Sequence, residues 1–196
     1  MSGSKRQGNG TGRSAAESSP PTTSLPALLD DGCDRRFRGL VNDLFTIASR
    51  MEIVRAHLGQ RLGITGPQYS VLMAVAHLQG EGGVSVGSVA QAMHVSSAFI
   101  ASESGKLASL KLLLKRPNPQ DGRGVLLSLA PSGRRKLHRL AHEIRAINDR
   151  FFGGLDACSF AGLSAMAGML VKGSSDALDY LAAVANERPL TLVAAE

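Results

Sequence analysis

The stretch from Val84 to Leu129 decides the fold: VSVGSVAQAMHVSSAFIASESGKLASLKLLLKRPNPQDGRGVLLSL. Its first half predicts two short helices, Val86 to Met93 and about Ser97 to Leu110, joined by a turn at His94–Ser96. Ser96 or Ser97 can begin the second helix, because a serine hydroxyl accepts a hydrogen bond from the free N–H groups of a first turn. The residues of that helix at inward-facing spacing are Ile100, Ser104, Leu107 and Leu110.

The second half of the same stretch predicts a β-hairpin with a basic tip. Hydrophobic runs of strand length at Leu112–Lys115 and Val125–Leu129 are separated by residues 116–124, RPNPQDGRG. A helix-turn-helix can place its second helix in a DNA major groove. A basic hairpin beside it can reach the phosphates or the neighbouring minor groove. Residues 84–129 therefore predict a winged helix-turn-helix that binds DNA.

Long helices are predicted on both sides of this stretch. Apolar residues recur at steps of three and four from Asp34 to about Leu62 and, after a break, to Leu78. Another long helix follows Pro131, with Ser132 as a candidate cap, and a last helical region covers about 159–184. These helices carry more apolar positions than one small winged domain needs, which favours a dimer.

We therefore expect a mainly α fold with a small antiparallel β-hairpin: a winged helix-turn-helix with a helical dimerisation region. The expected organisation is a disordered N-terminal arm at 1–31, dimerisation helices at 32–62 and 131–186, a winged helix-turn-helix domain at 63–130, and a C-terminal tail at 187–196.

Positive charge is concentrated in one part of the chain. The 196 residues carry a formal net charge of +6. Between Gly105 and Arg145, ten basic residues stand against two acidic ones, whereas Phe151–Glu196 holds two basic and five acidic residues. Charge clusters are usually solvated surface, but a basic region within a winged helix-turn-helix is the pattern expected of phosphate binding.

Other classes of function find little support in the composition. No apolar run approaches the ~20 residues that span a bilayer, and the first residues lack the apolar core of a secretory signal, so we expect a cytoplasmic protein without membrane contact. Cys33 and Cys158 form no CxxC pair. His138 and His142 have metal-ligand spacing, but no HExxH surrounds them. We expect no catalytic residue, no metal, no cofactor and no enzyme activity.

The order of the predicted elements resembles that of the MarR family of winged-helix transcriptional regulators, from about Phe37 to Phe152. The matching residues are Leu62–Thr65, Gln68–Tyr69, Val71–Leu72, Val89–Ala90, Met93, Val95–Ser96, Leu107, Leu112–Leu113, Lys115–Arg116, Pro119, Asp121, Arg123, Leu129 and Gly133. The resemblance implies a homodimer on a pseudo-palindromic operator in double-stranded DNA. It also implies repression that ends when a small molecule enters a crevice between the dimer helices and the DNA-reading domain.

The second helix of the pair departs from this family where it would read bases. Many members carry Thr-Arg where this chain has Ala101-Ser102, so the commonest guanine-reading side chain is missing. The predicted DNA-contacting residues of the helix are Ser96, Ser97, Phe99, Ser102 and Lys106. Phe99 fits a core position equally well, and Glu103 would repel phosphate unless it pairs with a base.

The hairpin matches the family better. Asp121 and Arg123 correspond to its acidic-x-Arg tip, in which the carboxylate steadies a guanidinium that enters the minor groove. Lys115 and Arg116 at the base of the hairpin are expected to touch phosphates. Lys111 stands where the family usually has glycine, and a left-handed backbone there would cost ~1 kcal/mol.

An effector site is predicted on the first two helices. Its candidate residues are Arg50, His57, Tyr69 and Met73. A cation beside an apolar slot suits a small organic acid, such as an aromatic acid, although a surface arginine or a core histidine is the simpler interpretation. Two alternatives to a ligand-released repressor stay open. One is an architectural DNA-binding protein without an effector; the other is a thiol redox sensor that uses Cys33 or Cys158.

Overall fold

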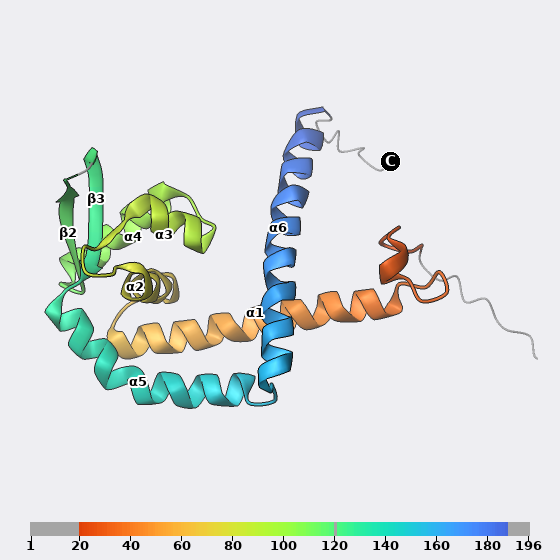
Figure 1. Cartoon of the computed structure of the whole chain (residues 1–196), viewed down its shortest axis with the longest axis horizontal. Coiled ribbons are helices and arrows are strands. Elements are labelled where there is room, and N and C mark those ends of the chain that lie inside the picture. Colours follow the sequence, from red (N-terminus) through yellow and green to blue (C-terminus); the bar gives the residue numbers. More distant parts are fainter. Residues whose placement is uncertain (1–19, 120, 188–196) are drawn as a thin grey trace, which may run out of the picture. The chain divides into compact units, whose positions relative to one another are not determined.

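The structure is a computed structural model that describes residues 20–119 and 121–187 (Figure 1). The chain forms two compact units, residues 1–70 and 71–196, and α2 crosses the boundary between them. The elements are η1 (Pro26–Leu28, a 3₁₀ helix), α1 (Arg35–Leu62), α2 (Gly66–Leu78), β1 (Val84–Ser85), α3 (Val86–Met93), α4 (Ser97–Ser109), β2 (Leu113–Asn118), β3 (Asp121–Leu129), α5 (Pro131–Phe152) and α6 (Ala157–Glu187). This order confirms the mainly α winged-helix fold predicted from the sequence.

Residues 20–34 form an N-terminal hook in front of α1. The Asp34 carboxylate accepts hydrogen bonds from the backbone N–H and the hydroxyl of Thr22, at 2.6 and 2.7 Å. The same carboxylate pairs with Arg38 at 2.9 Å. The hydrogen bonds from Thr22 and the charge of Arg38 hold the pKa of Asp34 below its ordinary value. The buried Asp34 is therefore the main polar anchor of the hook.

A tight turn completes the hook. Asp30 and Cys33 exchange two backbone hydrogen bonds of 2.9 Å around Asp31 and Gly32, which both have positive φ. The prediction of disorder over residues 1–31 is therefore wrong for residues 20–31. The hydrogen bonds made by Asp34 and by this turn hold the segment in place, and such bonds cannot be predicted from amino-acid composition. Residues 1–19 lie outside the described residues.

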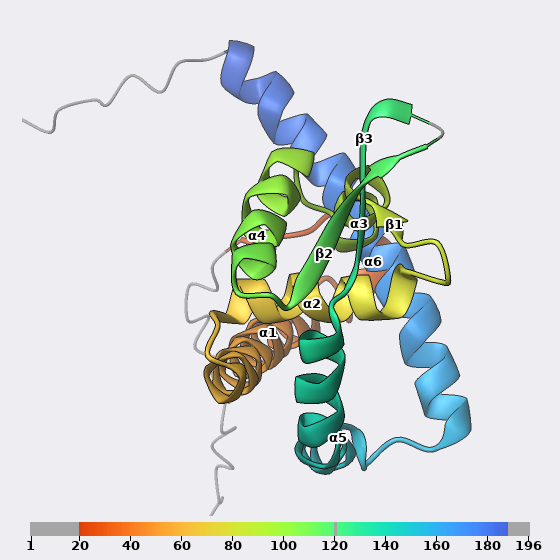
Figure 2. The ribbon, with the colours of Figure 1, turned by 90° about the vertical axis from the view of Figure 1, so that its left-hand side faces the viewer.

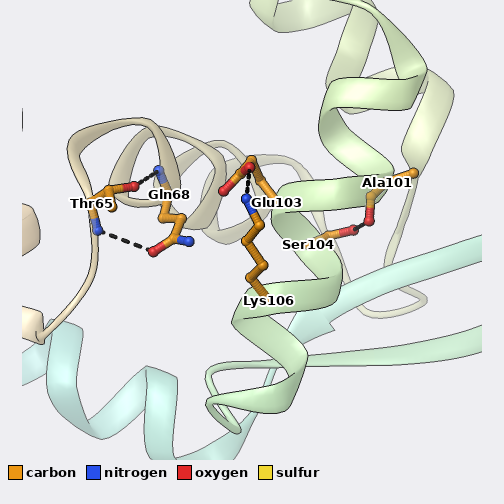
Figure 3. A network of polar contacts seen from close by, with 6 residues as sticks. All are labelled: Thr65, Gln68, Ala101, Glu103, Ser104 and Lys106. Atoms are coloured by element: carbon orange, nitrogen blue, oxygen red, sulfur yellow. Dashed lines mark hydrogen bonds and ion pairs between the residues drawn. The ribbon is translucent and has the colours of Figure 1, made fainter.

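The break between α1 and α2 has strong local causes. Gly63 ends α1 in the left-handed conformation, as its position after the last apolar residue predicts. Thr65 and Gln68 then cap α2 reciprocally (Figure 3). Gln68 Oε1 accepts from the Thr65 N–H at 3.1 Å, and Thr65 Oγ1 accepts from the Gln68 N–H at 3.4 Å. This capping box satisfies two N–H groups that would otherwise lack partners.

The second unit is built around a three-stranded antiparallel sheet with the order β1-β3-β2. Figure 2 shows β2 and β3 as a long hairpin beside α4. The Gln79 side chain, just after α2, accepts a hydrogen bond from the Leu129 N–H at 2.7 Å and so ties the end of α2 to β3. The fully buried apolar side chains of this unit include Val71, Leu72, Val75, Val89, Ile100, Leu107 and Leu127.

Three local predictions are wrong. β2 extends to Asn118 and β3 begins at Asp121, because backbone pairing continues beyond the apolar residues. Leu110 is 52% exposed, because the helix has already ended there. Ser132 does not cap α5: that helix starts after Ala130 without a side-chain cap, and the Ser132 hydroxyl donates to the Lys111 carbonyl instead.

The helices α5 and α6 meet at a bend of 90°. Glycines at 162, 168 and 173 do not interrupt α6. Its large apolar side chains are exposed, among them Phe160, Met169, Leu170, Leu178, Tyr180 and Leu181. In the part of the chain that the structure describes, no single helix is long and apolar enough to cross a membrane; α5 and α6 meet that test only as a bent pair.

Replacement of the hook's anchor should release residues 20–34. We expect Asp34→Ala to raise backbone hydrogen exchange across the hook, whereas Asp43→Ala, which removes an exposed carboxylate from α1, leaves exchange unchanged. Because the pKa of Asp34 is lowered on folding, the carboxylate stabilises the hook above its ordinary pKa of 3.8. That stabilisation is lost as the pH falls through the lowered value. Unchanged exchange in Asp34→Ala would remove Asp34 as the anchor.

Candidate nucleic-acid interface

A groove lies between the helix-turn-helix and the hairpin of the second unit. We call it the wing groove. Its volume is about 550 Å³, and it is lined by Ser85, Val86 and Gly87 at the start of α3, by Ser97, Ala98 and Ala101 on α4, and by Asn118, Asp121, Gly124 and Val125 on the hairpin. It brings together two of the predicted DNA-contacting residues, Ser97 and Asp121.

Two helices begin at the wing groove. Ser85 caps α3 by accepting a hydrogen bond from the Ser88 N–H at 3.0 Å. Ser96 caps α4 by accepting one from the Phe99 N–H at 3.2 Å. The first turn of a helix has further N–H groups without helical partners and carries positive partial charge. These helix ends offer N–H groups to an anion such as a phosphate, whereas the Asp121 carboxylate on the hairpin side of the groove repels one.

The exposed face of α4 next to the groove is made of short side chains. Ser97, Ala98, Ala101 and Ser102 are all exposed there, so a ligand can approach the backbone of this helix closely. Phe99 is half-buried, which fits neither a full core position nor a fully exposed contact. We conclude that α4 can offer hydroxyl and methyl groups to a ligand.

Lys106, the cation predicted on α4, pairs with a carboxylate of the same helix. Lys106 Nζ lies 2.6 Å from Glu103 Oε1 (Figure 3), and Glu103 is buried. Ser104 is fully buried and donates to the Ala101 carbonyl at 3.2 Å. Glu103 therefore lies against the protein rather than facing a ligand, and its carboxylate partly neutralises Lys106.

The hairpin presents its predicted cations to solvent. Lys115 and Arg116 are exposed on β2, opposite Leu127 and Leu126 of β3. At the tip, a Cβ atom added to Gly124 would lie 2.7 Å from Asp121 Oδ2, so glycine is what allows that carboxylate to rest against β3. Arg123 falls within β3, but its side chain lies outside the described residues. Its pairing with Asp121 stays a prediction.

The predicted effector residues lie on α1 and α2. Arg50 and His57 are exposed and seven residues apart on α1, and therefore share one helical face. Tyr69 is buried on α2, and this burial raises the pKa of its hydroxyl. Met73 is half-buried further along α2. Arg55 pairs with a neighbouring glutamate, so Arg50 is the more available cation. An effector site made from Arg50, His57, Tyr69 and Met73 stays a prediction.

Candidate redox and metal residues show no built site. Cys33 and Cys158 are exposed free thiols. Within residues 20–119 and 121–187, no group of three or more His, Cys, Asp or Glu side chains comes together as a metal ion would require.

Sequence reasoning missed several lining residues of the wing groove. These are Ser85–Gly87, Ala98, Ala101, Asn118, Gly124 and Val125. Most are small or apolar residues that carry no chemical signature. The available signal was their position, since Ser85–Gly87 and Ala98 lie in or next to the first turns of two serine-capped helices.

Comparison with known proteins shows a likeness of fold. No protein-family model matches the chain, and no curated protein matches it. The transcriptional regulator SlyA has a similar structure, with a TM-score of 0.60 and 15% identity over 72% of this chain and 98% of that chain. A mutant MarR from E. coli, complexed with operator DNA, has a TM-score of 0.57 and 18% identity over 69% and 95%.

A third solved structure is more similar in sequence. It is the transcriptional regulator PcaV from Streptomyces coelicolor, in complex with its natural ligand, with a TM-score of 0.52 and 28% identity. The match covers 65% of this chain and 90% of that chain. In all three comparisons at least 90% of the other protein is matched.

The serine cap of α4 can be tested by stability. We expect Ser96→Ala to lower the free energy of unfolding by about 1 kcal/mol, because the Phe99 N–H loses its acceptor. Ser102→Ala is the matched control: this exposed serine lies inside α4, where alanine is the better helix former. Denaturant titration followed by circular dichroism gives both values. Equal stability of the two variants would contradict the cap.

Proposed function

We propose that this chain, whose fold is that of the MarR family of winged-helix regulators, is a DNA-binding transcriptional regulator. The observation that carries the proposal is the wing groove, where two helix N-terminal ends and the hairpin tip line one hollow of about 550 Å³. A phosphate of the DNA backbone can accept hydrogen bonds from the N–H groups at these two helix ends. The start of α4 would then face the base edges of the major groove.

The charges of the hairpin support the same assignment. Lys115 and Arg116 are exposed on β2 of the hairpin, where each can neutralise a phosphate. Arg123 is the best candidate for a minor-groove contact, because a narrow minor groove concentrates negative potential. Since α4 offers short side chains, the hairpin cations and the shape of the DNA should contribute most of the affinity.

A homodimer is part of the proposal. On α1 the exposed large apolar side chains are Leu40, Leu44, Phe45, Ile47, Met51 and Ile53, and α6 adds those named above. Apolar surface of this extent on single helices is typical of an interface. A second copy of the chain is the partner we propose, because a two-fold pair would place two winged units on a pseudo-palindromic operator.

Release by a small organic effector is the finer part of the proposal. PcaV, at 28% identity, has been solved with its natural ligand, which supports a ligand-responsive regulator. We propose repression that ends on ligand binding, with Arg50 and His57 providing polar contacts and Tyr69 and Met73 the apolar wall. The competing function is an architectural DNA-binding protein, which would bind many sequences with similar affinity and show no release by metabolites.

The hairpin assignment predicts the effect of Arg123→Ala. Removal of one good DNA contact worth ~1–3 kcal/mol should weaken binding about tenfold or more. The probe is a duplex selected by footprinting of the purified protein on genomic fragments, and the dissociation constant is measured at fixed salt. Lys172→Ala, which removes one exposed cation from α6, is the control and should bind normally. Equal affinity of the two variants would refute the hairpin assignment.

The effector assignment predicts a separate behaviour for Arg50→Ala. This variant should keep its affinity for the selected duplex. A metabolite that is handled by the genes of the bound operon and releases the native protein from the duplex should not release Arg50→Ala. Release is measured by fluorescence anisotropy against a panel of those metabolites. A normal ligand response in Arg50→Ala would remove Arg50 from the site. The absence of any releasing metabolite for the native protein would favour the architectural function.

A further inference from the structure

The helix α5 carries a basic face that the proposed function does not use. Six residues, Arg134, Arg135, His138, Arg139, His142 and Arg145, fall within an arc of about 140° at 3.6 residues per turn. All six are exposed. We call this surface the α5 basic face. Its opposite side is apolar, with Leu140 buried, so the helix presents its cations outward.

Within the described residues, no ion pair involves the cations of the α5 basic face. None of its six side chains takes part in a hydrogen bond or an ion pair within the described part of the chain. The acidic residues of α5 are Glu143 and Asp149. Glu143 falls outside the arc and has a partner, whereas Asp149 falls within the arc, one turn beyond Arg145. Four guanidinium groups are therefore available to an anionic ligand.

The geometry of the face suits a chain of phosphates. Arg134, Arg135, His138 and Arg139 surround a shallow hollow of about 310 Å³. Arg145 extends the face to a length of about 16 Å at 1.5 Å per residue. Arginine binds phosphate through two parallel N–H groups. A single small anion would use one cluster, whereas a line of cations of this length matches successive phosphates of a polymer.

The α5 basic face lies far from the wing groove. β3 spans Asp121–Leu129, about 27 Å at ~3.4 Å per residue, and α5 begins two residues after its end. Figure 2 shows α5 and the hairpin tip at opposite ends of the hairpin. The length of the hairpin therefore separates the α5 basic face from the hairpin side of the wing groove.

We propose that the α5 basic face binds the phosphate backbone of a second DNA segment, so that the protein bridges two duplexes. The proposal rests on the proposed function for the first duplex. Binding at the second surface is independent of base sequence, since the face offers cations for phosphates and no element that enters a groove. Bridging would let a bound regulator hold distant DNA segments together.

The test is a sandwich assay with the full-length protein. A mixed-sequence 30-base-pair duplex is fixed to beads and saturated with protein in dilute salt, and capture of a second, labelled duplex is measured. The variant is Arg134→Gln/Arg139→Gln, because glutamine keeps helix propensity while removing both charges. The control, Arg35→Gln/Lys172→Gln, loses two exposed cations from α1 and α6. Circular dichroism checks that both variants fold.

We expect the native protein and the control to capture the second duplex and the α5 variant to lose that capture, with first-duplex affinity unchanged. The slope of log K against log salt for the second step should fall by about two. Capture by the α5 variant at the native level would overturn the proposal, because the bridging would then come from two winged units. An equal loss of both binding steps would make the face part of the first DNA site, and would also overturn it.

Two further arms separate this inference from the proposed function. Lys115→Gln/Arg116→Gln should weaken binding of the first duplex while leaving the α5 basic face intact. If this variant binds the first duplex normally, the result counts against the wing groove and not against the α5 basic face. Tripolyphosphate and poly-glutamate are added as competitors. A native protein that binds tripolyphosphate or poly-glutamate but captures no second duplex would refute DNA bridging.

Discussion

The backbone junction at Lys111 and Leu112 is the constraint that orients the other parts of the winged unit. Here α4 ends, β2 begins and the start of α5 packs against both. The Leu112 carbonyl accepts from the Ala130 N–H at 3.0 Å, and the Lys111 carbonyl accepts from the Ser132 hydroxyl. A Cβ atom on Gly133 would lie 2.2 Å from the Leu112 oxygen, so the approach of α5 requires glycine at this position. The direction of α4 and of the hairpin thus depends on contacts made outside both elements.

The junction also explains how a lysine can occupy a position that favours glycine. Lys111 has φ of 57°, a left-handed conformation that costs a residue other than glycine about 1 kcal/mol. The Lys111 N–H donates to the Ala108 carbonyl and the Leu112 N–H to the Leu107 carbonyl, both at 2.9 Å. These two bonds form a Schellman motif. Together with the burial of Leu112, these bonds hold Lys111 in the left-handed conformation and offset its backbone strain.

Local signals predicted the elements well, and long-range contacts decided what the sequence could not show. Serine caps and apolar spacing predicted α3, the turn and α4 to within a residue. The length of the hairpin was underestimated because ladder hydrogen bonds do not depend on side-chain polarity. Ser132 was assigned as a cap from its type, but the structure uses it to bond a residue 21 positions earlier. Asp34 likewise gains its role from Thr22, which no periodicity connects to it. For the interface, the charged candidates were visible from the sequence, whereas the small residues that shape the wing groove were not.

The short side chains on the outer face of α4 have a thermodynamic consequence. Alanine and serine have few rotamers to lose, whereas each immobilised lysine or arginine loses up to about 2 kcal/mol of conformational entropy. A helix with this face is rigid before it meets a partner. On binding, most of the side-chain conformational entropy is lost by the long side chains of the hairpin. Temperature and salt should therefore affect the contacts of α4 and those of the hairpin differently.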